Sequence, residues 1–143
     1  HYFVVAGEDD FKRYKQDYNL SLSDKKVLSK MIARSLEIKK SYIEIDEFDQ
    51  NERQVFNYGH SFGHAIESLT NYRISHGIAV SIGMDMSNFM SVKYGYMTNE
   101  DRQEMRKLLN KTIECHYYDS SINFHIVIPQ SKPYKYNLLL SQF

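Results

Sequence analysis

Apolar residues recur at helical spacing along most of this chain. After Asp24, apolar positions in the segment 21–46 return every three or four residues, which predicts an amphipathic helix with Asp24 as its N-cap. Residues 54–69 and 77–95 predict two more helices, and the second is apolar almost all round, as buried helices are. A further helix is expected after Thr98, which suits an N-cap. The pattern is therefore mainly helical.

The segments between and around these helices predict turns and a short hairpin. Residues 1–17 indicate the end of one helix, a turn at Ala6-Gly7-Glu8 and a short amphipathic piece. An acidic loop or loose helical turn is expected at 46–53, and a loop at 71–75. Residues 123–129 alternate like a strand and could pair with 137–143, across a turn that contains proline. We therefore predict a mainly α domain with a short β-hairpin near the C-terminus.

Composition excludes several classes of partner. The 143 residues carry 18 basic and 18 acidic side chains, so neither nucleic acid nor an anionic membrane is expected as a partner. No apolar run approaches the roughly 20 residues of a membrane span. The single cysteine, Cys115, suits a reducing compartment, and no signal peptide is visible, so a cytoplasmic location is expected. The chain opens without Met in an apolar run, as a piece of a longer protein would.

Three of the six histidines lie within the stretch NYGHSFGHAIESLTNYRISHG, residues 57–77. His60 and His64 are four residues apart on an expected helix, so both rings project from one face, and His76 follows a loop. This spacing suits ligands of one Zn²⁺, although such pairs also occur as partly exposed or hydrogen-bonded histidines. Ser61 stands where the metalloprotease pattern His-Glu-x-x-His needs its glutamate, so zinc proteolysis is not expected.

The same residues resemble a known signature. N-Y-G-H-S-F-G-H-A-I-E, followed by H-G-I-A-V-S-I-G-M, is similar to the pattern of 3-dehydroquinate synthases and related sugar phosphate cyclases. The upstream run K-K-S-Y-I-E-I-D-E-F-D-Q-N-E-R also resembles that family in register. The resemblance covers residues 36–97 closely and 1–35 more loosely. It implies the helical C-terminal domain of a two-domain enzyme, whose N-terminal α/β domain binds NAD and is absent from residues 1–143.

The resemblance also implies a metal centre. His60 and His76 correspond to two ligands of the family's divalent ion, Zn²⁺ or Co²⁺. The third ligand, a glutamate, would precede residue 1, with His1 near the position of a family lysine. The expected cofactors are therefore NAD and the metal, and the dinucleotide site is not expected in this chain.

Catalytic roles carry over in the same way. His64 corresponds to a histidine that faces the substrate phosphate and assists proton transfer, which an imidazole can do near neutral pH. Arg53 could grip a carboxylate, Asn57 could bond a hydroxyl, and Lys39 could add positive charge. From the residues alone, Arg53 and Lys39 are also compatible with solvated surface charge, and Asn57 with a helix cap. Structural or supporting roles are expected for three further matching acids, Asp46, Glu47 and Glu67.

The implied reaction converts 3-deoxy-D-arabino-heptulosonate 7-phosphate to 3-dehydroquinate and phosphate, in the shikimate pathway. The alternatives are a related cyclase, of the 2-deoxy-scyllo-inosose or 2-epi-5-epi-valiolone synthase type, and a non-catalytic remnant domain. A homodimer is expected. The chain departs from the family at Ile78, which replaces the acid of H-G-E, and after Ile113, where the tail is shorter and only Asp119 stands near the expected Asp-Lys-Lys run.

Overall fold

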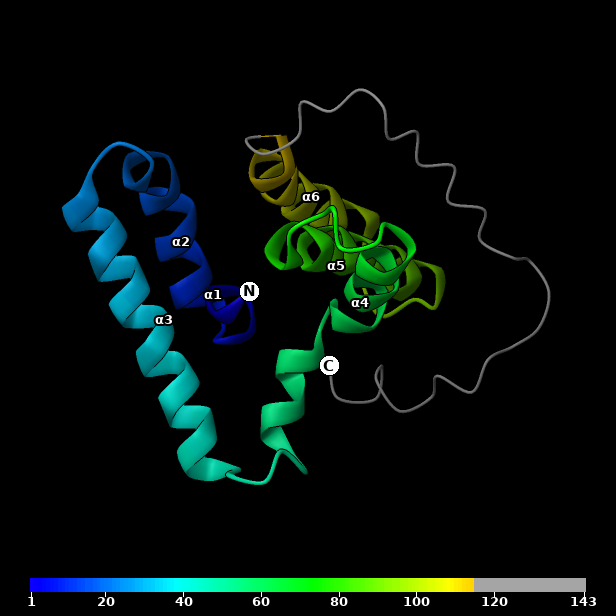
Figure 1. Cartoon of the computed structure of the whole chain (residues 1–143), viewed down its shortest axis with the longest axis horizontal. Helices are drawn as coiled ribbons and strands as arrows, with labels where there is room; N and C mark the ends of the chain where they lie inside the picture. Colours follow the sequence, from blue (N-terminus) through cyan, green and yellow to red (C-terminus); the bar gives the residue numbers. More distant parts are fainter. Residues whose placement is uncertain (115–143) are drawn as a thin grey trace. The chain divides into compact units, whose positions relative to one another are not determined.

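The computed structural model describes residues 1–114, all of whose regular elements are helical. They fall into two compact units, which divide after His60 and are described separately. The first unit contains three α-helices and a 3₁₀ helix, and the second contains three α-helices (Figure 1). The bounds are α1 Tyr2–Val5, α2 Glu8–Ser21, α3 Lys25–Ile45, η1 Glu52–Asn57, α4 His60–Leu69, α5 His76–Lys93 and α6 Asn99–Glu114.

In the first unit, α2 and α3 pack together as a helical hairpin. Asp24 caps α3, because its side chain accepts hydrogen bonds from the backbone N–H groups of Lys26 and Val27. Arg34 on α3 reaches across to α2, where its Nε and Nη2 each donate to one carboxylate oxygen of Asp10 at 2.8 Å. This two-pronged contact fixes the register of the two helices.

Aromatic side chains join α1 and α3 to the 3₁₀ helix η1. The Phe56 ring lies 4.9 Å from the rings of both Tyr2 and Tyr42, measured between centroids. The Tyr42 hydroxyl donates to the carbonyl of Val5 at 3.1 Å. These contacts hold the segment that precedes the histidines against the N-terminal helix.

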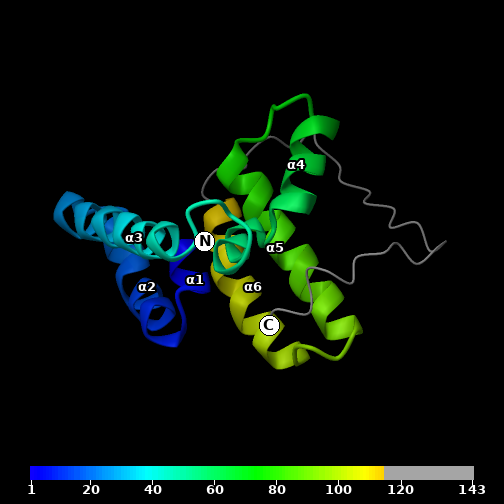
Figure 2. The same cartoon turned by 90° about the horizontal axis from the view of Figure 1, so that it is seen from below.

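In the second unit, α5 packs against both α4 and α6 (Figure 2). A small hydrophobic core forms where α4, the loop after it and α5 meet, from the buried residues Ile66, Ile74, Ile78 and Ala79. Gly63 lets α4 approach closely, since a Cβ there would lie 3.1 Å from the Cα of Val80. A side chain at this position would force the two helices apart.

Charged groups connect α5 to α6. Asp85 accepts a hydrogen bond from Arg102 at 3.0 Å, and Arg106 lies 3.5 Å from the same carboxylate oxygen.

Thr98 caps α6 by accepting from the backbone N–H of Asp101 at 3.1 Å, and its hydroxyl donates back to the Asp101 carboxylate. The N-caps expected at Asp24 and Thr98 are thus both confirmed.

One helix prediction was wrong in its extent. The sequence pattern predicts a continuous helix over 54–69, whereas the structure has η1, a turn at Tyr58-Gly59, and then α4. Gly59 has φ +78°, a left-handed conformation that glycine adopts without strain, and this residue interrupts the helix just before His60.

Two other expectations concern the C-terminal hairpin and membrane-spanning helices. The predicted hairpin at 123–129 and 137–143 lies outside the described residues. Within the described part of the chain, none of the helices has the length and apolar character needed to cross a membrane.

Candidate functional site

A strained turn between α4 and α5 places His76 beside α4. Asn71 and Tyr72 both have left-handed backbone angles, with φ +50° and +57°. For Tyr72 this conformation costs roughly 1–3 kcal/mol. The turn is held by the Tyr72 N–H, which donates to the Glu67 carbonyl at 2.8 Å, and by the Thr70 hydroxyl, which donates to the Ile66 carbonyl at 2.8 Å. The chain thereby returns to Glu67 at the start of α5.

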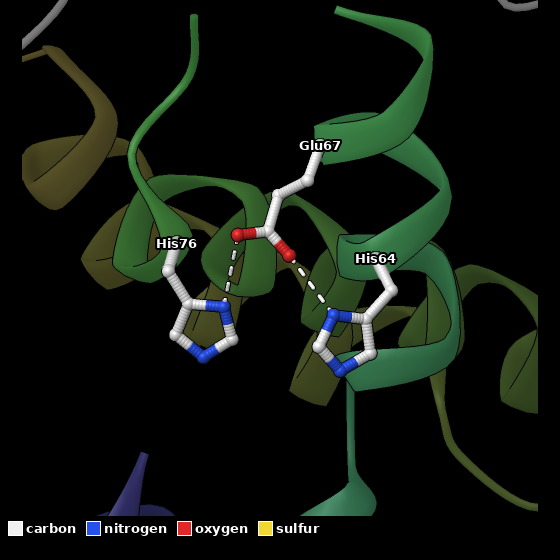
Figure 3. A group of neighbouring side chains, drawn as sticks. All are labelled: His64, Glu67 and His76. Atoms are coloured by element: carbon white, nitrogen blue, oxygen red, sulfur yellow. Dashed lines mark hydrogen bonds and ion pairs between the residues drawn. The ribbon is translucent and has the colours of Figure 1, made fainter. Parts of the chain in front are cut away.

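Glu67 lies at the centre of a cluster formed by His64, Glu67 and His76 (Figure 3). One carboxylate oxygen lies 2.9 Å from Nδ1 of His64, and the other lies 3.1 Å from Nδ1 of His76. The two rings are stacked, with centroids 5.6 Å apart. His64 and Glu67 are one helical turn apart on α4, whereas His76 reaches the carboxylate only through the turn.

The carboxylate is buried while the rings are exposed. The Glu67 side chain is 9% exposed, compared with 63% for His64 and 55% for His76. Burial alone would raise the pKa of the Glu67 carboxyl, but hydrogen bonds from the two imidazoles outweigh burial and the pKa lies below its usual range. The cluster therefore presents two imidazoles outward from an ionised carboxylate.

The donor set suits a divalent transition metal. Ligand atoms of His64, Glu67 and His76 all lie within 4.8 Å of one another. Imidazole nitrogens and carboxylate oxygens are the ligands of catalytic Zn²⁺ sites, and Co²⁺ accepts the same donors. The chemistry of this region of the second unit is thus compatible with the expected metal.

His60 lies at the end of the first unit. Its ring is 5.2 Å from the ring of His1, and its Nδ1 lies 3.3 Å from the Tyr58 carbonyl. Nε2 of His1 contacts that same carbonyl at 3.0 Å. Because His60 and His76 belong to different units, their pairing at one metal stays a prediction.

A second buried carboxylate, Asp46, organises the loop that carries Arg53. Asp46 accepts hydrogen bonds from the backbone N–H groups of Gln50, Asn51 and Arg53, at 3.0, 2.7 and 3.1 Å. The Gln50 contact lowers the pKa of Asp46 most; burial opposes it, and the other two N–H groups add to the lowering. The Arg53 side chain is half-buried, and its Nη1 donates to the Glu47 carbonyl at 2.8 Å.

Comparison with known proteins gives the same family as the sequence signature. Residues 1–130 match the family described as 3-dehydroquinate synthase C-terminal. The chain belongs to this family.

Curated relatives agree with this family assignment. The 3-dehydroquinate synthase of Helicobacter hepaticus is 41% identical over 125 residues, which are 85% of this chain and 35% of the relative. Those of Campylobacter curvus and Sulfurimonas denitrificans are 42% and 40% identical, over 69% and 76% of this chain and 29% and 31% of their own lengths. The chain thus spans about a third of each relative.

The structure explains one departure from the 3-dehydroquinate synthase pattern. Ile78, which stands where the family motif has an acid, is 6% exposed and lies in the core with Ile66, Ile74 and Ala79. An ionised carboxylate at this depth would lack water and would need a partner. In this chain the position therefore stabilises the α4–α5 packing.

The remaining predicted residues of this 3-dehydroquinate synthase domain lie in the first unit. Lys39 is exposed on α3 and Asn57 is exposed at the end of η1. The sequence indicated a supporting role for Glu67 but not its contact with both histidines. The His64–Glu67 spacing was a visible signal for one contact, whereas the second depends on the turn at 70–75.

Proposed function

We propose that this chain is the metal- and substrate-binding part of a 3-dehydroquinate synthase, a phosphate-eliminating lyase of the shikimate pathway. The enzyme would convert 3-deoxy-D-arabino-heptulosonate 7-phosphate to 3-dehydroquinate and phosphate. The observation that carries the proposal is the family match over 1–130, in a chain where His64 and His76 converge on one buried carboxylate. The matched residues are 35% of the Helicobacter hepaticus relative, which supports a further domain in the complete enzyme, and the family resemblance implies that this domain would bind NAD.

The divalent metal, Zn²⁺ or Co²⁺, would be held by His60 and His76 with a glutamate from outside this chain. The imidazole and carboxylate ligands in the cluster of His64, Glu67 and His76 support a metal near His76. When bound, NAD would supply the hydride acceptor and donor, and the metal a Lewis acid for the substrate hydroxyls.

Four side chains would bind and activate the substrate. His64, with its exposed ring and buried hydrogen-bond partner, would transfer a proton near the leaving phosphate. Arg53 would hold the substrate carboxylate, and its contact with the Glu47 carbonyl supports a fixed guanidinium orientation. Lys39 would add positive charge, and Asn57 would bond a hydroxyl. The enzyme is expected to be cytoplasmic and homodimeric.

Two alternatives remain distinct from this proposal. A related cyclase, of the inosose- or valiolone-forming type, would act on a sugar phosphate without a carboxylate. A non-catalytic remnant would keep the helical fold but bind no metal. The names of the curated relatives favour the synthase, since those compared above are all called 3-dehydroquinate synthase.

Steady-state kinetics of the full-length protein test the proposal. With NAD and Zn²⁺ or Co²⁺, we expect phosphate release from the acidic heptulosonate phosphate and little from a neutral sugar phosphate. Arg53→Lys keeps the charge but loses the two-pronged contact, so kcat/KM for the acid should fall about 10- to 150-fold, or roughly 1.5–3 kcal/mol. Preference of the wild type for the neutral sugar phosphate would establish the related cyclase instead.

The 143-residue chain alone gives a second test. It contains no Gly-x-Gly-x-x-Gly turn for a pyrophosphate, so no turnover is expected from this piece. Phosphate release by a verified 143-residue protein would contradict the two-domain account.

A further inference from the structure

The contact of one buried carboxylate with two histidines assigns Glu67 a specific task. We propose that Glu67 is a positioning residue, which accepts hydrogen bonds from the Nδ1–H groups of His64 and His76 and thereby fixes both rings in the tautomer with its lone pair on Nε2. This inference rests on the proposed function for its consequence in catalysis. The tautomers themselves are a property of the protein that can be measured without turnover.

The argument begins with the donors and acceptors. Each Glu67 oxygen has its own imidazole, at 2.9 Å from Nδ1 of His64 and 3.1 Å from Nδ1 of His76. An ionised carboxylate can only accept hydrogen bonds, so both Nδ1 atoms must donate. A glutamate carboxyl is ordinarily ionised at neutral pH, and here each oxygen faces a ring nitrogen that can donate. A neutral imidazole with a proton on Nδ1 carries its lone pair on Nε2.

The burial of Glu67 strengthens its preference for the tautomer with the proton on Nδ1. Glu67 lies in α4 beside the buried core residue Ile66, and the backbone carbonyl of Glu67 is also fixed, by the N–H of Tyr72. The side chain is 9% exposed, so water offers little replacement for a lost imidazole donor. Reversal of either tautomer would leave a buried carboxylate oxygen facing a nitrogen lone pair.

The consequence is that each ring directs Nε2 away from the carboxylate, as Figure 3 shows. For His76 this atom would be the metal ligand, and for His64 it would be the atom that gives or takes a proton. Carboxylate partners of metal-bound histidines orient the ring and raise its basicity, and their loss typically costs about 10- to 100-fold in metal affinity or activity. Here a single carboxylate would serve the ligand and the proton-transfer group together.

The first measurement determines the tautomers in the full-length protein. Ring nitrogens of ¹⁵N-labelled histidine are observed by NMR at about pH 8.5, where imidazole is neutral. Signals are assigned with His64→Asn and His76→Asn. We expect a protonated Nδ1 and an unprotonated Nε2 for both residues. A proton on Nε2 of either ring in the wild type would overturn the proposal.

The second measurement adds Zn²⁺ to the same sample. We expect the His76 signal typical of metal coordination to appear at Nε2, while Nδ1 keeps its proton. Coordination through Nδ1 would mean that the metal displaces the hydrogen bond between His76 and Glu67, which contradicts a positioning role for Glu67.

Glu67→Gln provides the matched variant, because the amide has the same shape but only one accepting oxygen. Its NH₂ group must face one of the two Nδ1 atoms, and that ring is expected to change to the Nε2–H tautomer. Change at His76 should lower Zn²⁺ affinity about 10- to 100-fold, and change at His64 should lower kcat by a similar factor with metal retained. If both rings keep the wild-type tautomer, the carboxylate does not set it and the proposal fails.

A control variant and an independent outcome complete the test. Glu44→Gln removes a carboxylate from an exposed position on α3, and is expected to leave both tautomers unchanged. If the wild type has the expected tautomers but does not turn over heptulosonate phosphate, the proposed function fails and the tautomer assignment holds. If turnover is found with either ring in the other tautomer, the assignment fails and the proposed function holds.

Discussion

Each unit of the molecule contains a buried carboxylate with several hydrogen-bond donors, but the donors differ. In the first unit Asp46 accepts from three backbone N–H groups, and in the second Glu67 accepts from two imidazole rings. The two residues are 6% and 7% exposed. Asp46 holds backbone N–H groups and so fixes the path of the chain, whereas Glu67 holds two imidazole rings and so fixes the direction of side chains for which we propose a role in the reaction. Two carboxylates with the same burial can therefore serve the fold in one case and a site in the other.

The largest expected effect comes from the removal of His64, one of the two imidazole donors to Glu67. His64→Ala should lower kcat of the full-length enzyme about 10²- to 10⁴-fold, the range of general acid–base catalysis. The His64 ring itself is exposed, but its loss leaves one oxygen of the buried Glu67 carboxylate without its donor, so the free energy of unfolding should also fall, by about 1–3 kcal/mol. Parallel measurement of phosphate release and urea unfolding checks this. Normal turnover in the variant would show that the exposed ring takes no part in the reaction.

Substitution of Asp46 should act through stability alone. Asp46→Asn has a single accepting oxygen and must turn an NH₂ group toward a backbone N–H, so the urea midpoint at neutral pH should fall. The folded-state pKa of Asp46 is lowered, so its stabilisation is present above the unfolded pKa and is lost as pH falls through the folded pKa.

The pH dependence of this variant sharpens the test. As pH falls through the folded-state pKa of Asp46, which lies below the usual aspartate range, the wild-type carboxyl becomes protonated, and the difference in urea midpoint between wild type and Asp46→Asn should shrink. Glu44→Gln, an exposed change of the same kind, should leave the midpoint unaltered. A difference that is constant from neutral to acidic pH would mean that the charge of Asp46 does not stabilise the loop.

The smallest effect on stability is expected at Asp24, a carboxylate that also accepts from backbone N–H groups but is more exposed to water than Asp46. Asp24 caps α3 and accepts from the N–H groups of Lys26 and Val27, at 2.8 and 3.4 Å, near the surface. Asp24→Ala should lower the free energy of unfolding by about 1 kcal/mol, as loss of an N-cap does. Asp24→Ser, which keeps a capping oxygen, should restore most of it in the same urea experiment. A larger loss at Asp24 than at Asp46 would reverse the order that burial predicts.

Local sequence patterns predicted most of the helices of the fold. Helical periodicity predicted α3 and α5, and the N-caps at Asp24 and Thr98 follow from side-chain chemistry at the helix ends. The break before His60 was not predicted, because the apolar spacing continues through Gly59 and only its left-handed backbone interrupts the helix.

The site was less accessible to sequence reasoning, because its key contact is not local. The i,i+3 spacing of His64 and Glu67 makes their contact foreseeable on a helix. His76 joins the same carboxylate only because Asn71 and Tyr72 adopt left-handed angles, which no spacing rule gives for tyrosine. The family resemblance assigned roles to these residues but did not show how one carboxylate could serve two of them.

Metal titration of the full-length protein tests the central claim, that these histidines serve a metal-dependent enzyme. Calorimetry with Zn²⁺ or Co²⁺ should detect one bound ion per chain in the wild type. His60→Ala and His76→Ala should each abolish binding, whereas His64→Ala should retain it, because its role is proton transfer. Equal loss of binding in all three variants would contradict this division of roles and indicate a site with three histidine ligands, and absence of binding to the wild type would leave a non-catalytic domain.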